Sequence, residues 1–317
     1  MSVADQNAPD TNPCDGRDGV GCVEMLIEPR RRDLGGGVFV GRVLPYAKRR
    51  HVGPFVFFDE MGPGELGPGD GMDVRPHPHI GLSTVTWLFD GEMTHRDNLG
   101  YEQVIRPGDV NWMTAGRGVV HSERTGDEAR ASTLKMHGVQ TWVALPEDDA
   151  ETDPEFFHHK AEDLPRVSGE GWSGVLIVGA AYGATSPVKT YSPLFYLSVD
   201  AEPGSRIPLP DDHEERAVYL VDGAASAGGA SIPEQTMAVF EPGGAPTIEV
   251  SEPSRVMLLG GAPLGERHIW WNFVSASRDR IEQAKRDWTG AAEAGWPENG
   301  AFTLPPSERE FIPLPEK

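Results

Sequence analysis

The sequence predicts an all-β protein with two domains of the same kind, and three observations lead to this prediction. Its 317 residues suffice for two domains of ordinary size, each with its own core. The chain contains 38 glycines and 28 prolines but few long apolar stretches of helical period, which favours many short strands joined by turns. One pattern also occurs twice: residues 86–91 (TWLFDG) with 107–109 (PGD), and residues 218–223 (VYLVDG) with 242–243 (PG).

Residues 1–23 are expected to form a flexible tail ahead of the first domain. They are rich in Asp, Asn, Pro and Gly, and no apolar segment follows a basic start, so neither a secretory signal nor a transit peptide is expected. Cys14 and Cys22 are the only cysteines, and their spacing fits no zinc knuckle. We therefore expect free thiols and a cytoplasmic location.

The chain is strongly acidic, with 28 Lys and Arg against 49 Asp and Glu and a net charge of −21. Such a surface repels phosphate backbones and anionic lipids, which argues against direct binding of nucleic acid or membranes. No run of about eighteen apolar residues is present to span a bilayer. Residues 30–32 (RRR) and 48–50 (KRR) form two basic clusters. We expect them to pair with nearby carboxylates, and docking of an anion or a partner is the alternative.

The first domain is expected to span residues 24–146, and short apolar and β-branched runs predict its strands. Residues 55–58 (FVFF) are typical of a buried strand. A later strand alternates apolar residues, Val85, Trp87 and Phe89, which would fill one face of a barrel.

Two pairs of metal-capable side chains lie about forty residues apart in this domain. His77 and His79 form one pair, and His121 and Glu123 form the other, each with i, i+2 spacing. Successive side chains of a β-strand point to opposite faces, so the members of each pair share a face. Two neighbouring strands would then aim three imidazoles and one carboxylate at a common point, a ligand set that suits a borderline divalent ion. A pair that binds no metal is the alternative for either pair taken alone.

Four other side chains near these pairs have less specific roles. Trp112 and Met113 could line the metal cavity or simply fill the core. His95 is expected in a polar loop, and His137 begins a strand and could face the same cavity. We expect neither histidine to be a metal ligand, because the set of four is already complete.

Several longer motifs of this region carry a resemblance to a known family. They are residues 77–79 (HPH), 107–118 (PGDVNWMTAGRG), 121–123 (HSE) and 137–143 (HGVQTWV). With these motifs the chain resembles the pirin family of bicupins, from about residue 32 to about residue 288. The resemblance implies two stacked cupin (jelly-roll) β-barrels with a metal in the N-terminal one. It also implies oxidation of flavonols such as quercetin for some members, whereas others act as nuclear cofactors.

One position departs from the family pattern. Many pirins and most single-domain cupins carry a Glu four residues after the second histidine of His-x-His, and this chain has Ser83 there. In pirins the fourth ligand resembles Glu123, so the set His77, His79, His121 and Glu123 is retained. A carboxylate that could tune these ligands is missing.

A second barrel is expected over residues 172–275, after an acidic, proline-containing linker over residues 147–171. Where the first barrel has His-x-Glu, the second has Met257 and Leu259, and its only nearby histidine is His213. We therefore expect this barrel to lack metal ligands.

Residues 276–317 are expected to form a short helix and an extended tail. Ser277 is a candidate N-cap, and residues 281–288 carry apolar side chains at near-helical spacing. The segment after the helix is rich in proline and is expected to run along the surface.

The expected function is that of a non-haem metal-dependent dioxygenase, an oxidoreductase acting on a flavonol such as quercetin. His77, His79 and His121 would hold the metal as neutral imidazoles. Glu123 would be both a ligand and the catalytic group that accepts the enol proton, as the resemblance to pirin-like quercetinases suggests. Fe(II) is the expected ion, one per chain, although Mn, Co, Ni, Cu and Zn also accept this ligand set. The expected partners are a small aromatic substrate and dioxygen, and a protein partner is left open.

Two other functions remain open. One is a metal-dependent, redox-sensing binding or regulatory protein without turnover. The other is a metal-dependent isomerase acting on a sugar or small metabolite without dioxygen. Oxygen consumption by metal-loaded protein with substrate would discriminate between these functions and a dioxygenase.

Overall fold

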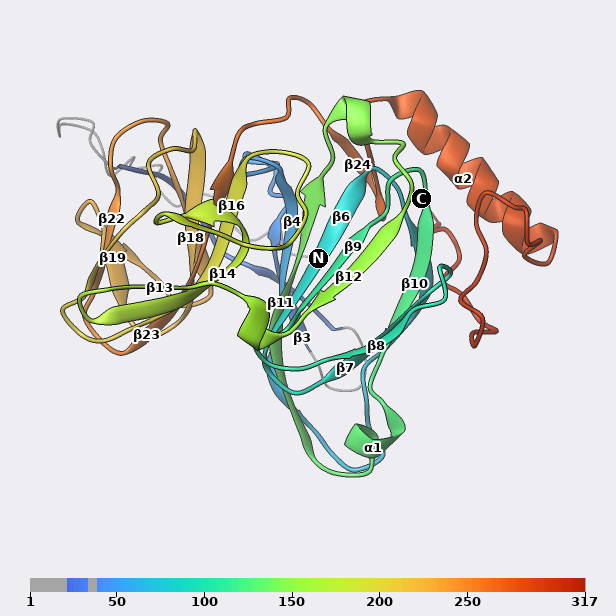
Figure 1. The fold of residues 1–317 in the computed structure, drawn as a ribbon, viewed down its shortest axis with the longest axis horizontal. Helices are drawn as coiled ribbons and strands as arrows, with labels where there is room; N and C mark the ends of the chain where they lie inside the picture. The colour runs from blue at the N-terminus through green and yellow to red at the C-terminus, as the bar shows by residue number, and fades with distance from the viewer. Residues whose placement is uncertain (1–21, 34–38, 317) are drawn as a thin grey trace, which may run out of the picture.

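The computed structural model describes residues 22–33 and 39–316, in which β-strands dominate and two α-helices occur. Two barrels lie side by side, the second to the left of the first in Figure 1, and helix α2 (Arg278–Glu293) lies beyond the first barrel on the opposite side. The prediction of an all-β fold with two barrels is confirmed. Residues 1–21 of the predicted flexible tail, which include Cys14, lie outside the described residues.

Cys22 corrects one expectation about the thiols. It is disulfide-bonded, so the prediction of a free thiol is wrong for this residue. Sequence spacing carries no information on how closely two sulfur atoms approach in space. Because persistent disulfides are typical of oxidising compartments, the argument from free thiols to a cytoplasmic location no longer holds. Within residues 22–33 and 39–316, no helix has the length and apolar character needed to cross a membrane.

The first barrel consists of a seven-stranded and a four-stranded antiparallel sheet. The large sheet has the order β12-β9-β6-β11-β4-β3-β2, and the small sheet has the order β5-β10-β7-β8. These strands are rich in β-branched and aromatic residues, which fit a pleated, half-buried surface. Their bounds are β2 Arg30–Asp33, β3 Phe39–Leu44, β4 Phe55–Leu66, β5 Asp73–His79, β6 Leu82–Asp90, β7 Met93–Asp97, β8 Glu102–Ile105, β9 Val110–Thr114, β10 Val119–Arg124, β11 Leu134–Ala144 and β12 Glu155–His159. The short helix α1 (Asp127–Arg130) lies between β10 and β11.

The second barrel repeats this arrangement. Its large sheet has the order β1-β21-β18-β23-β16-β14-β13, with β15 paired to β14, and its small sheet has the order β17-β22-β19-β20. The bounds are β1 Val23–Ile27, β13 Arg166–Gly169, β14 Trp172–Ala181, β15 Ala184–Thr185, β16 Leu194–Ala201, β17 Arg206–Pro208, β18 Glu215–Asp222, β19 Ala225–Ala227, β20 Ala230–Ile232, β21 Thr236–Phe240, β22 Thr247–Val250 and β23 Ser254–Gly261.

The equal strand orders place β17 and β22 of the second barrel where β5 and β10 lie in the first. Ile207 of β17 is directly opposite Ile248 of β22. Both isoleucines and Val250 are buried in the apolar core of the second barrel. Hydrocarbon side chains thus occupy the strands that carry imidazoles and a carboxylate in the first barrel.

Met257 and Leu259 do not replace His121 and Glu123, so this part of the prediction is wrong. Both residues lie on β23, the counterpart of β11, and they belong to a core cluster that spans both barrels. The true counterpart of β10 is the short strand β22, whose four residues carry too weak an apolar pattern to be assigned from sequence.

The two barrels exchange their edge strands. β1 precedes the first barrel but pairs with β21 of the second, with Val23 opposite Phe240. β12 precedes the strands of the second barrel, as β1 precedes those of the first, but it pairs with β9 of the first barrel, with Glu155 opposite Thr114. Residues 24–27 therefore complete the second barrel instead of the first. The segment predicted as a linker, residues 147–171, contains two strands, β12 and β13. Acidic residues and prolines surround both strands in the sequence, so their short strand patterns were not recognised.

A shared apolar core joins the two barrels. The ring of Phe58 lies 4.7 Å from the ring of Tyr219, and the ring of Phe55 lies 5.5 Å from the ring of Tyr196. Burying one large apolar side chain contributes about 1.5–3 kcal/mol. Since many such side chains from both barrels meet in one cluster, we expect the barrels to fold as a single unit.

The alternating residues of β6 and β9 face this shared core. Val85, Trp87 and Trp112 belong to the cluster that contains side chains from both barrels. Of the two alternatives for Trp112, the structure therefore supports core filling and not a position in the wall of the metal cavity. Met113, the next residue along β9, points the other way and packs with Trp142 in a core of the first barrel.

The C-terminal segment covers the outer face of the first barrel's small sheet. A hairpin of β24 (His268–Trp270) and β25 (Phe273–Ser275) leads into α2. The Ser277 hydroxyl accepts a hydrogen bond from the Arg280 N–H at 3.4 Å, which confirms the predicted N-cap. The helix continues to Glu293, beyond the predicted end at residue 288.

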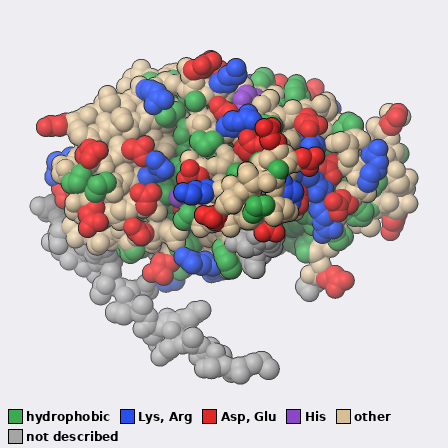
Figure 2. All heavy atoms as spheres, turned by 90° about the horizontal axis from the view of Figure 1, so that it is seen from below, with side chains coloured by type: hydrophobic (Ala, Val, Ile, Leu, Met, Phe, Trp, Pro, Cys, Tyr) green, Lys and Arg blue, Asp and Glu red, His purple; other side chains and the backbone are tan. Residues whose placement is uncertain are grey.

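The segment after α2 packs against the barrel instead of only extending along the surface. The Ile312 N–H donates to the Pro76 carbonyl of β5 at 2.8 Å. The Glu308 carboxylate accepts hydrogen bonds from the Ser122 hydroxyl at 2.7 Å and from two nitrogens of Arg124 at 2.8 and 2.7 Å. Figure 2 shows acidic and basic side chains interspersed on the face seen from below, so the net charge of −21 is not gathered into one patch on that face.

Candidate metal centre

Two neighbouring strands of the small sheet bring the predicted ligands together. β5 and β10 are antiparallel, and His121 lies directly opposite His77 while Val119 lies opposite His79. β5 carries one extra residue between Val74 and His77 relative to β10, whereas β10 pairs with β7 without a register shift from His121 to Arg124, so His121 and Glu123 keep regular strand alternation. The i, i+2 spacing thus reflects a real shared face.

The three histidines form a compact buried cluster. One ring nitrogen from each of His77, His79 and His121 lies within 4.8 Å of the others. Their exposed fractions are only 7%, 1% and 1%. Burial, followed by the charge of His77, holds the pKa of His79 and of His121 well below the usual histidine value. The neutral imidazole favoured in this way is the form that binds a metal.

Backbone carbonyls fix the tautomers of the first pair. The Nδ1 atom of His77 lies 2.9 Å from the Arg75 carbonyl, and the Nδ1 atom of His79 lies 3.1 Å from the Asn272 carbonyl. A carbonyl can only accept, so Nδ1 carries the proton in both rings and Nε2 is left with a lone pair. The Nε2 atom of His79 is buried and has no hydrogen-bond partner.

A chain of two further residues orients His121. Its Nδ1 lies 3.3 Å from the Nδ1 of His95, and the Nε2 of His95 lies 2.9 Å from a carboxylate oxygen of Asp97. With Nε2 of His95 donating to Asp97, the Nδ1 of His95 can accept a proton from His121, which leaves Nε2 of His121 free. That atom is buried and has no partner, like its counterpart in His79. Such outer partners set the orientation and basicity of metal-binding histidines.

His95 is not in a polar loop, so that expectation is wrong. It lies on β7, directly opposite Glu123 of β10, and it is 5% exposed. Its ring stacks on Phe156 of β12 at 4.4 Å between centroids. The polar residues after it suggested a loop, but Asp97 is fully buried and accepts the backbone N–H groups of Leu99 and Tyr101.

Glu123 lies beside the cluster and is held by one hydrogen bond. Its Oε1 atom accepts from the Gln140 side chain at 2.9 Å. Its Oε2 atom lies 3.9 Å from Nε2 of His77, is buried, and has no hydrogen-bond partner. An unpaired buried carboxylate oxygen is costly, and a bound cation would satisfy it.

His137 faces away from the metal centre, so the idea that it shares the cavity is wrong. Its Nε2 lies 2.9 Å from the buried carboxylate of Glu60, and the Tyr219 hydroxyl of the second barrel donates to the same carboxylate at 2.6 Å. Residues of β11 alternate, so its neighbours Gln140 and Trp142 face the metal centre instead.

The structure also identifies residues that sequence analysis missed. Gln140 lies within the motif of residues 137–143 that carried the family resemblance, although no role was assigned to it there. Asn272 could not, because it is far from His79 in sequence and contributes only a carbonyl. Gly81 has φ +68, and a Cβ there would collide with the Val274 carbonyl of β25. A glycine is needed where this hairpin approaches the metal-binding strand.

Ser83, the position that departs from the family pattern, lies on β6. Its hydroxyl is 3.1 Å from the Thr114 hydroxyl, and both side chains are fully buried. A hydroxyl pair therefore occupies the place where a carboxylate was expected from other cupins.

The donor set fits a divalent transition metal. One ring nitrogen from each of His77, His79 and His121 lies in the cluster, and an unpartnered carboxylate oxygen of Glu123 lies beside it, 3.9 Å from Nε2 of His77. Nitrogen with carboxylate ligation of this kind suits borderline ions. Fold and site together define a bicupin whose described residues hold one candidate metal centre, in the N-terminal barrel.

Comparison with known proteins places the chain in a family. The Pirin family model matches residues 37–143, and the model of the Pirin C-terminal cupin domain matches residues 196–292. The chain therefore belongs to the pirin family. It is 49% identical to a pirin-like protein of Caulobacter vibrioides over 93% of this chain and 100% of that protein. It is 32% identical to human Pirin over 85% of this chain and 92% of that protein.

A solved structure agrees with this assignment. The crystal structure of quercetin 2,3-dioxygenase from Acinetobacter baumannii superposes with a TM-score of 0.83 at 33% sequence identity. The alignment covers 92% of this chain and 95% of that protein.

Proposed function

We propose that the protein is a metal-dependent dioxygenase that acts on a flavonol such as quercetin. The observation that carries this proposal is the convergence of unpartnered, buried donor atoms from His79, His121 and Glu123 beside His77. The similarity to quercetin 2,3-dioxygenase from Acinetobacter baumannii supports the choice of substrate class.

His77, His79, His121 and Glu123 would hold the metal, with Fe(II) as the expected ion. A bound divalent ion would act as a Lewis acid toward the 3-hydroxyl and 4-carbonyl oxygens of the flavonol and would provide redox chemistry for dioxygen. The neutral state of His79 and His121, which results from their burial, keeps their Nε2 lone pairs available.

Glu123 would accept the proton of the flavonol 3-hydroxyl. Its Oε2 atom has no hydrogen-bond partner, whereas Oε1 is held by Gln140 at 2.9 Å. The carboxylate is thus fixed by Oε1, and Oε2 would take the proton when its coordination to the metal loosens. The side chain is 5% exposed, so bulk water competes little for this proton.

Oxygen consumption tests the proposal directly. Fully metallated protein is mixed with quercetin under anaerobic conditions, air is admitted, and both dioxygen uptake and loss of the visible flavonol band are followed. We expect both signals, with metal-free protein inactive. If metallated and metal-free protein behave alike with several flavonols, a metal-dependent regulatory protein without turnover becomes the better conclusion.

A further inference from the structure

A cavity of about 740 Å³ lies where both barrels meet the C-terminal segment. It is separate from the metal centre and shares no residue with it. Its walls come from the loop before β4, the start of β18, the segment through β24 and the first turns of α2. The lining residues are Lys48, Arg49, Arg50, His51, Glu215, Glu266, Arg267, His268, Ile269, Trp270, Arg278, Ile281, Glu282 and Lys285.

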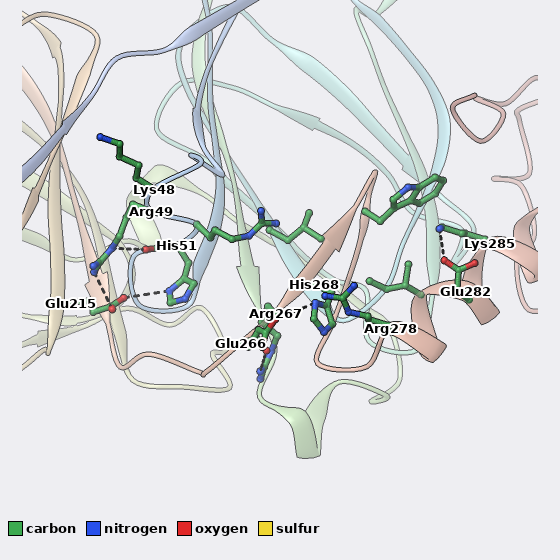
Figure 3. A pocket seen from close by; sticks show the side chains of 14 residues that line it. Lys48, Arg49, His51, Glu215, Glu266, Arg267, His268, Arg278, Glu282 and Lys285 are labelled. Atoms are coloured by element: carbon green, nitrogen blue, oxygen red, sulfur yellow. Dashed lines mark hydrogen bonds and ion pairs between the residues drawn. The ribbon is translucent and has the colours of Figure 1, made fainter. Parts of the chain in front are cut away.

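This cavity is positively charged although the protein is acidic. Six Lys or Arg side chains line it against three Glu, whereas the whole chain carries a net charge of −21. Arg267 lies near the middle of the wall, with Arg49 on one side and Arg278 on the other (Figure 3). A local excess of cations against such a background attracts anions to this place.

Two of the three glutamates are already engaged by cations. The Glu215 carboxylate contacts Arg49 at 3.0 Å and accepts the Gly53 N–H at 2.6 Å. Glu282 lies 2.5 Å from the Lys285 ammonium. The expectation that the basic cluster 48–50 pairs with carboxylates is therefore confirmed for Arg49.

Three guanidinium groups in the cavity form no ion pair within 4 Å with a carboxylate of the described residues. Arg50 and Arg278 are exposed and make neither a hydrogen bond nor an ion pair there. Arg267 is half-buried, and its N–H groups donate to the carbonyls of Leu264 at 2.8 Å and Leu145 at 3.2 Å. These carbonyls hold the guanidinium in place without neutralising it, and the charge of Glu147 acts on it only from beyond ion-pair distance.

One wall of the cavity is apolar. It is formed by Ile269 and Trp270 of the β24 hairpin and by Ile281 of α2. The Lys285 ammonium lies 3.9 Å from the centre of the Trp270 ring, so a cation is held at the border between the two parts. A ligand that fills this space needs an anionic group and an apolar or aromatic portion.

We infer that this cavity binds a small organic phosphate. Arg50, Arg267 and Arg278 would bind the phosphate, because the planar guanidinium matches phosphate oxygens with paired hydrogen bonds. The organic portion would lie against Ile269 and Trp270. The volume is in the range of about 300–1,000 Å³ that is typical of small-molecule sites. Such binding goes beyond the flavonol oxidation proposed for the metal centre.

Calorimetric titration of the full-length, metal-free protein with three probes tests the inference. The probes are adenosine monophosphate, adenosine and inorganic phosphate. We expect adenosine monophosphate to bind at least tenfold more tightly than either of the other two, with an affinity that falls as salt rises. Equal binding of adenosine and adenosine monophosphate, or no binding of either phosphate probe, would overturn the inference.

Charge-matched variants locate the site. Arg278→Gln and Arg50→Gln should each weaken the binding of adenosine monophosphate severalfold, and Arg267→Gln by tenfold or more. The control is Arg206→Gln. Arg206 lies on β17, outside the cavity, in an exposed pair with Glu249 of β22, so this variant removes the same charge elsewhere. Arg278 and Arg50 are exposed, so these two variants remain informative if Arg267→Gln unfolds.

Two outcomes would contradict the assignment. Equal weakening by Arg206→Gln and Arg278→Gln would mean that only the overall charge matters. Binding of a glutamate-rich peptide in place of adenosine monophosphate, lost in Arg278→Gln, would assign the cavity to an acidic protein partner. Dioxygen consumption with quercetin should be the same in Arg278→Gln and wild type, which separates this site from the metal centre.

Discussion

At the scale of single residues, Asp97 controls His121 although another side chain lies between them. Its carboxylate lies 2.9 Å from Nε2 of His95, whose Nδ1 faces Nδ1 of His121 at 3.3 Å. The position of one proton on His95 therefore decides whether His121 presents its Nε2 lone pair to the cluster. Replacing the acceptor at Asp97 by a donor would reverse this order.

Asp97→Asn is expected to lower metal affinity by about ten- to a hundredfold. The new amide can donate to Nε2 of His95, which moves the His95 proton to Nδ1 and opposes the proton on Nδ1 of His121. Competition with a chromophoric chelator measures the affinity. Asp200→Asn, in an exposed carboxylate paired with Arg255, is the control and should change nothing. Unchanged affinity in Asp97→Asn would contradict the proposed orientation of His121.

His79→Ala and His121→Ala are each expected to lose the bound metal. Each substitution removes a buried Nε2 donor that no other side chain can replace. Elemental analysis of protein purified without chelators or a histidine tag should give one metal per chain for wild type. His213→Ala, a histidine of the second barrel, should match wild type. Full metal content in both cluster variants would mean that the ion binds elsewhere.

Glu123→Gln is expected to reduce turnover of quercetin by more than its loss of metal explains. The amide keeps the size of the side chain and can still contact Gln140, but it cannot accept the 3-hydroxyl proton as a carboxylate does. Rates are therefore compared per bound metal, with kcat and KM determined separately. A rate per metal equal to that of wild type would remove Glu123 from the proton transfer.

The four predicted ligands were recognisable at this scale because strand alternation depends only on local spacing. The imidazoles of His77, His79 and His121 do cluster across the β5–β10 pair, and Glu123 lies beside them. The carbonyl of Asn272 was out of reach of sequence analysis, because any residue type could supply it.

At the scale of elements, the C-terminal segment packs against β5 and β10, the strands that carry the candidate metal ligands. Glu308 accepts hydrogen bonds from Ser122 and Arg124, which alternate with His121 and Glu123 on β10. Burial raises the pKa of Glu308. The hydrogen bonds from Arg124 and Ser122 and the positive charge of Arg124 outweigh burial and hold this pKa below its ordinary value. Deprotonation of Glu308 and docking of this segment therefore favour each other.

Glu308→Gln is expected to destabilise the protein by about 1.5–3 kcal/mol at pH 7, the usual range for hydrogen bonds to a charged group. A carboxyl whose pKa is lower in the folded state contributes stability above its unfolded pKa and loses it as the pH falls through its folded pKa. The unfolding free energies of wild type and variant should thus differ at pH 7 and begin to converge only as the pH falls below the ordinary glutamate pKa of about 4.3.

Glu310→Gln is the matched control for this measurement. Its carboxylate also contacts Arg124, at 2.9 Å, but 54% of its side chain is exposed. A surface pair of this kind contributes about 0–1 kcal/mol. Equal destabilisation by both variants at pH 7 would show that burial of Glu308 adds nothing.

At this scale the helix was predictable from the sequence, but the role of the segment after it was not. Ser277 and the apolar spacing of residues 281–288 were sufficient to predict α2. The docking of Glu308 and Ile312 onto β10 and β5 depends on contacts between residues far apart in sequence, which local patterns do not report. The same limit explains the misassignment of β1, whose partner lies near the other end of the chain.

At the scale of the whole molecule, exchange of β1 and β12 makes each barrel depend on sequence outside its own repeat. Ile27 is fully buried in the core that joins the barrels, whereas Leu26 beside it is 39% exposed. The internal repeat predicted two similar barrels correctly, because both copies keep the same turn sequence. It could not predict which edge strand completes which barrel.

Ile27→Asp is expected to destabilise the whole protein by more than about 4 kcal/mol, because a charge would be buried without a partner. Leu26→Asp on the same strand should change stability by about 0.5 kcal/mol or less. Thermal unfolding followed by both fluorescence and circular dichroism should show one transition for each variant. Loss of only the second barrel in Ile27→Asp would contradict the single folding unit.

The pairing of Val23 with Phe240 also sets an order of events during protein synthesis. β1 leaves the ribosome among the first strands but has no partner until β21 has emerged, so its apolar side chains must wait uncovered while the first barrel assembles. The metal centre is completed even later, because the Asn272 carbonyl that orients His79 is among the last parts to emerge. Binding of a metal in this geometry would therefore require that the chain through Asn272 has already emerged and folded.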